Sequence, residues 1–87
     1  MFLKVFVTSP EKQEEMTVDV EATGTVKDIK RAVATRTGLE AGQMELDMAG
    51  IKLTPDEAKI EDLGLKEGAG LTCRVSESTS SSSTSSS

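Results

Sequence analysis

The spacing of apolar residues changes from a strand pattern to a helix pattern, and this change constrains the fold of the chain most. Residues 2–8 and 16–21 alternate apolar and polar side chains, which is typical of β-strands. Directly afterwards, Val26, Ile29 and Val33 recur at the spacing of one face of an α-helix. Two strands joined by a short polar loop predict a hairpin, and the helix that follows can cover its apolar face.

The predicted helix has start and stop signals at its two ends. Thr25 is suited to the N-cap, and Asp28 stands three residues later, where the acidic residue of a capping box belongs. Gly38 is placed to end the helix in a left-handed conformation, and Arg36 near the last turn suits the helix dipole. The sequence therefore predicts a helix bounded by Thr25 and Gly38.

Alternation returns in the second half of the chain. Residues 44–48 and 51–53 predict two short strands around a tight reversal at Ala49–Gly50, and residues 71–75 predict a final strand. The helix and the sheet must bury their apolar faces against each other, because neither can do so alone. We therefore expect an α+β fold, in which a mixed sheet of four to five strands packs on one helix and the last strand lies beside the first.

The chain divides into a globular body and a serine-rich end. Residues 1–75 have the mixed apolar and charged composition of one small domain. Residues 76–87 consist of Ser, Thr and a single Glu, so we expect a disordered tail or linker. Such a segment most simply joins a domain to a further part of a longer protein, and an inert tail is the alternative.

Charge and the absence of targeting signals exclude several classes of partner. The net charge is −5 and the basic residues are scattered, whereas nucleic-acid binding calls for a basic cluster. Lys27, Lys30 and Arg31 do cluster, and we interpret them as a solvated helix face. No stretch has the roughly 18 apolar residues of a membrane span, and the first residues do not resemble a secretory signal. We expect a monomer in the cytoplasm or nucleus that binds neither nucleic acid nor membranes.

No set of residues in the sequence predicts catalysis, a metal or a cofactor. The chain has no histidine, which removes the usual general base and the usual zinc ligand. Cys73 falls on the inward side of the last predicted strand, where we expect inert packing. The acidic pairs Asp56–Glu57 and Glu61–Asp62 lack the spacing of a calcium loop. We therefore predict that the protein is not an enzyme.

The order and lengths of the predicted elements, together with several motifs, resemble ubiquitin and its relatives in the β-grasp family. The helix start TVKDIK looks like the family's helix opening. The most specific match is the stretch 46–75, whose family landmarks are Leu46, Ala49–Gly50, Leu53, Ile60, Asp62, Leu65 and Leu71. This resemblance covers nearly the whole body and implies a ubiquitin-like β-grasp fold.

The sequence departs from the family pattern in three places, of which the first two are the end of the last strand and the partner-binding patch. Conjugated modifiers end their last strand in a flexible tail closing with Gly-Gly, but here the strand runs into Ser76 and no Gly-Gly follows Gly70. Many relatives also bind partners through an apolar patch centred on an isoleucine, with a valine and a histidine beside it. The resemblance assigns these three positions to Asp47, Arg74 and Thr72.

The altered patch predicts polar recognition. We expect Asp47 and Arg74 to form a cross-strand ion pair, and an apolar partner would meet a carboxylate there. The lysine used for the best-known ubiquitin chains corresponds to Ile51, which is either an exposed contact or part of the core. Phe6 alternates with inward valines, so we expect it on the outer sheet face, where it either anchors a partner or leans on the hairpin.

These observations predict a non-catalytic, ubiquitin-like docking domain at the N-terminus of a larger protein linked to the ubiquitin–proteasome or protein-handling machinery. Other proteins with complementary charge would bind its outer sheet face. The predicted contact residues are Lys4, Phe6, Glu45, Asp47, Ile51, Thr72 and Arg74. Two alternatives remain open: the precursor of a modifier that is conjugated to targets after its tail is removed, and a scaffold with no link to ubiquitin.

Overall fold

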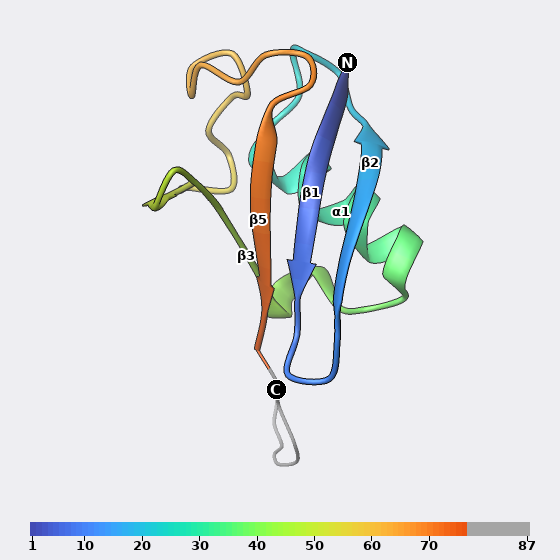
Figure 1. The fold of residues 1–87 in the computed structure, drawn as a ribbon. Helices are drawn as coiled ribbons and strands as arrows, with labels where there is room; N and C mark the ends of the chain where they lie inside the picture. Colours follow the sequence, from blue (N-terminus) through green and yellow to red (C-terminus); the bar gives the residue numbers. More distant parts are fainter. Residues whose placement is uncertain (77–87) are drawn as a thin grey trace.

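Strands and helices follow one another along residues 1–76, the part of the chain that the computed structural model describes (Figure 1). A hairpin comes first, then the α-helix, a single turn of 3-10 helix at Ala41–Gln43 and three further strands. The elements are β1 (Phe2–Thr8), β2 (Gln13–Asp19), α1 (Val26–Thr37), β3 (Met44–Met48), β4 (Ile51–Lys52) and β5 (Gly70–Val75).

The strands of residues 1–76 form one five-stranded mixed sheet in the order β2-β1-β5-β3-β4. The pair β1 and β5 is parallel, and the other neighbouring pairs are antiparallel. The last strand therefore lies in the middle of the sheet beside the first, as expected (Figure 1). The predicted α+β β-grasp architecture is confirmed.

The helix begins and ends where its sequence signals predict. The backbone N–H of Thr25 donates to Asp28 Oδ2 at 3.1 Å, which is one half of a capping box. At the other end, Gly38 adopts a left-handed conformation with φ 78° and ψ 11°, and its N–H donates to the carbonyl of Ala34 at 2.6 Å. Glycine adopts this conformation without the steric cost that a Cβ would bring, so the helix stops there.

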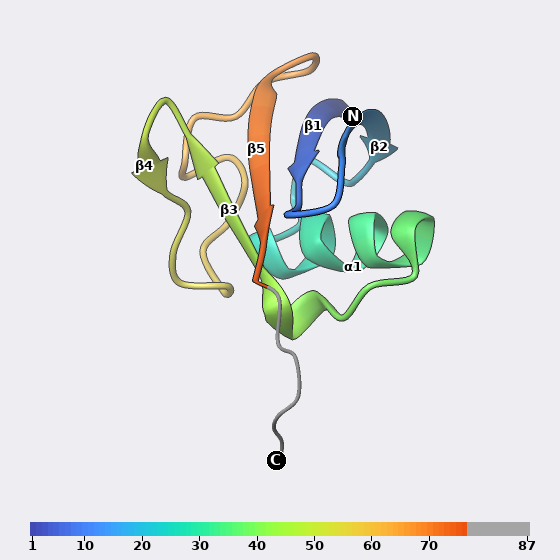
Figure 2. The same ribbon diagram turned by 60° about the horizontal axis from the view of Figure 1, so that its bottom comes forward.

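The hydrophobic core lies between α1 and the sheet face that it crosses (Figure 2). Among the described residues, no polar or charged side chain is buried in it. Both Met44 and Cys73 belong to the core, and for Cys73 this confirms the predicted inward position. The buried side chains are Leu3, Val5, Val7, Val18, Val20, Val26, Ile29, Val33, Met44, Leu46, Leu53, Ile60, Leu65, Leu71 and Cys73.

Two local predictions were wrong. The second strand begins at Gln13, not at residue 16, because its ladder with β1 extends through three exposed polar residues that carry no apolar alternation. Lys30 is not a solvated residue of the helix face, since its side chain is only 13% exposed and its Nζ lies 2.9 Å from Asp56 Oδ1. Its neighbours Lys27 and Arg31 are exposed, as predicted.

Candidate protein-interaction surface

The side of the sheet opposite α1, here called the outer face, is formed by the side chains that alternate with the core residues. It combines aromatic, hydroxyl and charged groups, and most of them are exposed. The strand registers bring these residues together from all five strands. The outer face consists of Phe2, Lys4, Phe6, Thr8, Gln13, Glu15, Thr17, Asp19, Glu45, Asp47, Lys52, Thr72 and Arg74.

One row of side chains, here called the central row, crosses the outer face from edge to edge. Phe6 is opposite Glu15 of β2 and Thr72 of β5. Asp47 of β3 is in turn opposite Thr72 and Lys52. The central row therefore runs Glu15, Phe6, Thr72, Asp47, Lys52, and directly opposed side chains in neighbouring strands are close enough to interact.

Phe6 lies on the outer face, as the alternation predicted, and 51% of its surface is exposed. Its neighbour across the hairpin is Glu15, which is itself exposed. Phe2 is similarly exposed, at 53%, and belongs to the same strand face. The sequence prediction omitted Phe2 from the contact residues, although the same period-2 pattern assigns it to the outer face.

Asp47 is the residue of the central row with unsatisfied hydrogen-bonding capacity. Its side chain is partly buried, and its Oδ1 atom is shielded from solvent without a hydrogen-bond partner in residues 1–76. A shielded polar atom without a partner costs about 1–3 kcal/mol. A donor from another molecule can reach this oxygen only when the Asp47 side chain turns outward, and the missing partner lowers the cost of such a turn.

The expected ion pair between Asp47 and Arg74 is wrong. The register of β3 and β5 puts Glu45 opposite Arg74 and puts Asp47 opposite Thr72. Arg74 is thus one row away from the carboxylate with which it was predicted to pair. The ion pairs found in the described part of the chain join the N-terminus to Asp19 and Lys30 to Asp56, and neither involves the central row.

Ile51 is set apart from the other predicted contact residues. It is 67% exposed, which excludes the alternative that it packs into the core. Its cross-strand partner is Met48, so the register assigns Ile51 to the side of the sheet opposite Asp47 and Lys52. The structure therefore brings together Lys4, Phe6, Glu45, Asp47, Thr72 and Arg74 on one face, and Ile51 lies at the edge outside it.

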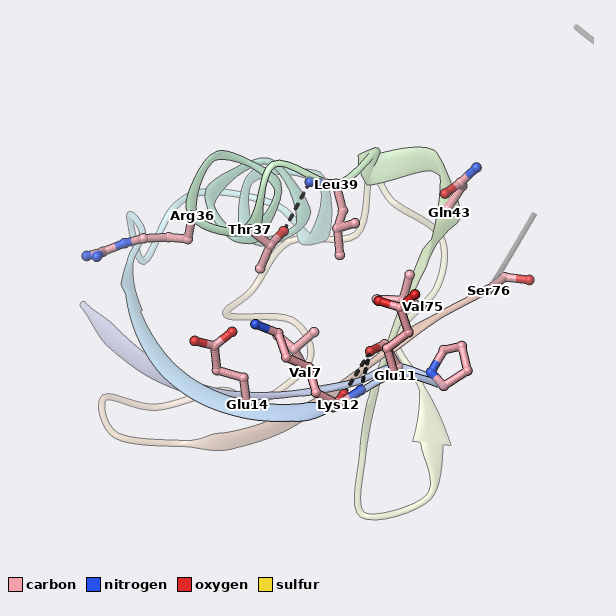
Figure 3. A pocket seen from close by; sticks show the side chains of 12 residues that line it. Val7, Glu11, Lys12, Glu14, Arg36, Thr37, Leu39, Gln43, Val75 and Ser76 are labelled. Atoms are coloured by element: carbon pink, nitrogen blue, oxygen red, sulfur yellow. Dashed lines mark hydrogen bonds between the residues drawn. The ribbon is translucent and has the colours of Figure 1, made fainter. Parts of the chain in front are cut away.

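A groove of about 580 Å³ lies away from the outer face, between the β1–β2 turn and the C-terminal end of α1 (Figure 3). Leu39 is directed toward the hairpin, whereas Arg36 extends away from the opening (Figure 3). Leu39 is 37% exposed and lines this groove. The lining residues are Val7, Ser9, Pro10, Glu11, Lys12, Glu14, Arg36, Thr37, Leu39, Gln43, Val75 and Ser76.

The sequence could not reveal the groove, because its walls come from three separated segments. The β1–β2 turn is held by Ser9, whose hydroxyl donates to the carbonyl of Lys12 at 2.7 Å. On the helix side, the N–H of Leu39 donates to Thr37 Oγ1 at 3.2 Å. The basic and acidic side chains of the lining are equal in number, so the groove has no charge preference.

The remaining reactive group of the body is the Cys73 thiol, which is fully buried. Burial raises the pKa of Cys73 from an ordinary 9.0 to about 11, with a smaller raising effect from Asp47 and a lowering effect from Lys30. A thiol in this state is a poor nucleophile at neutral pH.

Within residues 1–76, no group of three or more acidic, Cys or His side chains is placed to hold a metal ion. In the same range, no helix has the length and apolar content to cross a membrane.

Comparisons with known proteins agree with this geometry. A sequence model described as the ubiquitin family matches residues 5–78. Among solved structures, the solution structure of the ubiquitin-like domain of an Arabidopsis thaliana protein is similar, with a TM-score of 0.68. It shares 23% sequence identity, and the match covers 93% of this chain and 85% of that chain. No curated protein matches.

Proposed function

Because this chain belongs to the ubiquitin family, we propose that it is a non-catalytic docking domain that holds other proteins against its outer face. Domains of this family are typically non-catalytic themselves. The observation that carries the proposal is the central row, in which the exposed Phe6 and the unpartnered Asp47 stand two strands apart. An exposed aromatic ring with charged neighbours is typical of residues that anchor interfaces.

The chemistry of this face favours partners with complementary charge. Lys4, Glu45 and Arg74 surround the central row, and all three are exposed. Charges at the rim of an interface mainly set the association rate and the choice of partner. The family suggests that the partner belongs to the ubiquitin–proteasome or protein-handling machinery, in the cytoplasm or nucleus.

Conjugation is the competing function within the same family. The chemistry of conjugation uses a terminal Gly-Gly, whereas here β5 ends at Val75, Ser76 follows, and no Gly-Gly occurs after Gly70. Residues 77–87, predicted to be a disordered tail or linker, lie outside the described residues. The sequence at the end of β5 therefore supports docking over attachment to targets.

Affinity capture with charge-reversed variants tests the proposal. The full chain is immobilised, and proteins bound from a cell extract are quantified by mass spectrometry for the wild type, for Lys4→Glu and for Arg74→Glu. Arg31→Glu on the exposed helix surface is the matched control. We expect the outer-face variants to lose partners by about 5-fold or more while the control keeps them, since rim charges steer association. Loss in the control alone, or retention by all variants, would contradict the proposed surface.

The competing function has its own readout in the same preparation. The full chain and a chain that ends at Val75, which represents the modifier after removal of its tail, are each incubated with a ubiquitin-activating enzyme and ATP, and products are separated without reducing agent. Docking predicts no thioester adduct. An adduct that reducing agent releases would support the modifier.

A further inference from the structure

The central row contains an exposed aromatic ring and an unpartnered carboxylate on the two sides of one small residue. Phe6 and Asp47 both have Thr72 as their cross-strand partner, one from β1 and one from β3. Thr72 is partly buried, and its side chain is shorter than those of its two neighbours in the row, Phe6 and Asp47. The space above Thr72 is therefore bordered by the aromatic ring of Phe6 on one side and by the carboxylate of Asp47 on the other.

The distance between neighbouring strands leaves room above Thr72 for one cationic group. Neighbouring strands are about 4.8 Å apart, so a group above Thr72 lies about one such spacing from the strands that carry Phe6 and Asp47. A cation interacts with an aromatic ring within about 6 Å of the ring centre. At the same position it can donate to the carboxylate of Asp47 once that side chain turns outward, since Oδ1 is shielded and has no hydrogen-bond donor in residues 1–76.

Resting on the proposed docking function, we infer that the outer face binds an arginine side chain of its protein partner, with the guanidinium above Thr72 between Phe6 and Asp47. Arginine fits better than lysine for three reasons. Its planar guanidinium stacks on an aromatic ring, it donates two parallel hydrogen bonds to a carboxylate, and it is less strongly hydrated than an ammonium group.

The charges around the site agree with a single cation as the occupant. The outer face has four carboxylates and three cationic side chains, so one added guanidinium balances them. Lys52 beside Asp47 and Arg74 in the next row both oppose a cation at long range. Recognition therefore depends on the short-range contacts to the ring and the carboxylate. A partner with a general positive charge but no positioned cation cannot make these contacts.

Binding of a synthetic peptide tests this inference. The probe is Ac-GSLRLSG-amide, and two matched peptides carry lysine or the neutral isostere citrulline in place of arginine. Binding to the isotope-labelled full chain is followed through backbone amide shifts in NMR, up to about 2 mM peptide, a range that detects millimolar dissociation constants. We expect the arginine peptide to shift the amides of Phe6, Asp47 and Thr72, with at least about 5-fold weaker binding of the citrulline peptide.

Matched variants separate the two contacts from general effects of charge and shape. Asp47→Asn is compared with Glu14→Gln, an exposed carboxylate of β2 on the opposite side of the sheet, and Phe6→Leu is compared with the similarly exposed Phe2 changed to Leu. We expect Asp47→Asn and Phe6→Leu to weaken arginine-peptide binding by about 3-fold or more, and the controls by less than 2-fold, given the sizes of such contacts.

Three results would overturn the inference: no shifts at the highest concentration, equal binding of the arginine and citrulline peptides, or equal effects of Asp47→Asn and Glu14→Gln. Its failure is distinguishable from failure of the docking function. If partners from extract are lost with Lys4→Glu and Arg74→Glu but the peptide result is negative, docking stands and the arginine is not its ligand. If the extract partners are retained by those variants, the docking surface itself is wrong.

Discussion

Val5 and Phe6 are neighbours in the same strand, but they belong to two surfaces with different tasks. Val5 is fully buried against the helix side, whereas half of Phe6 faces solvent. The same contrast separates Leu46 from Asp47 in β3. The inner surface is apolar at every buried position and determines the fold, because its burial provides the driving force. The outer face has the unsatisfied and exposed groups, and changes there are expected to alter binding more than stability.

The largest effect is expected for a truncation on the inner surface. Leu46→Ala should lower the free energy of unfolding by about 2–5 kcal/mol, since it removes buried methyl groups and leaves a cavity. Glu45→Ala, the exposed neighbour on the outer face, should change it by less than about 0.5 kcal/mol. Urea unfolding followed by circular dichroism measures both. Similar losses for the two variants would contradict the division between the surfaces.

A second effect belongs to the inner surface and appears only at alkaline pH. The pKa of Cys73 lies at about 11 in the folded chain because burial disfavours the thiolate, compared with an ordinary 9.0. Between these values the unfolded chain releases the thiol proton while the folded chain keeps it. The free energy of unfolding therefore falls as the pH rises through this window, by up to about 2.7 kcal/mol at about 1.4 kcal/mol per pH unit.

Urea unfolding at pH values on both sides of this window checks the prediction. Cys73→Ala provides the control, because it is less stable at every pH but has no thiol to titrate. We expect the stability of the wild type to fall more steeply with pH than that of the variant. Parallel curves for the two proteins would show that the thiol does not contribute to this dependence.

A smaller effect is expected when the helix is weakened without altering either sheet surface. Asp28→Ala removes the acceptor for the Thr25 N–H and should lower the free energy of unfolding by about 0.5–2 kcal/mol. Peptide and partner binding at the outer face should be unchanged, because Asp28 is exposed on the helix. Thermal unfolding gives the first quantity and NMR titration the second. Weaker binding in this variant would indicate that the outer face depends on helix packing.

A small effect on stability, with the opposite sign, is expected at Asp47 itself. Asp47→Asn keeps the shape of the side chain and removes charge from a shielded oxygen that has no partner in the described chain. The free energy of unfolding should stay the same or rise by up to about 1 kcal/mol. If urea unfolding instead shows a lower free energy of unfolding for the variant, the carboxylate has a structural role. The outer face would then not be separable from the fold.

The sequence predicted the inner surface better than the outer one, for a physical reason. Burial imposes a period on apolar residues, so the spacing of Val26, Ile29 and Val33 predicts the helix from the sequence alone. Polar residues impose no such period, which is why the start of β2 at Gln13 was missed. Pairing across strands depends on register, and the assignment of Arg74 to Asp47 failed because Glu45 occupies the opposed position.

The groove beside Leu39 could not be predicted, since it forms only when the hairpin turn, the helix end and the end of β5 come together. The shielding of Asp47 Oδ1 is likewise a property of the assembled sheet and not of the residue type. By contrast, the exposure of Phe2 was predictable from the alternation in β1, which assigned Phe6 to the same face.

The central claim is that this ubiquitin-family chain acts by reversible docking through the outer face. The most direct test is to purify the tagged full chain from cells twice, under native and under fully denaturing conditions, and to search both preparations by mass spectrometry for branched peptides. Docking predicts partners that are present in the native preparation and absent after denaturation. Peptides in which a target lysine is joined through an isopeptide bond to the C-terminal residues of this chain would contradict it.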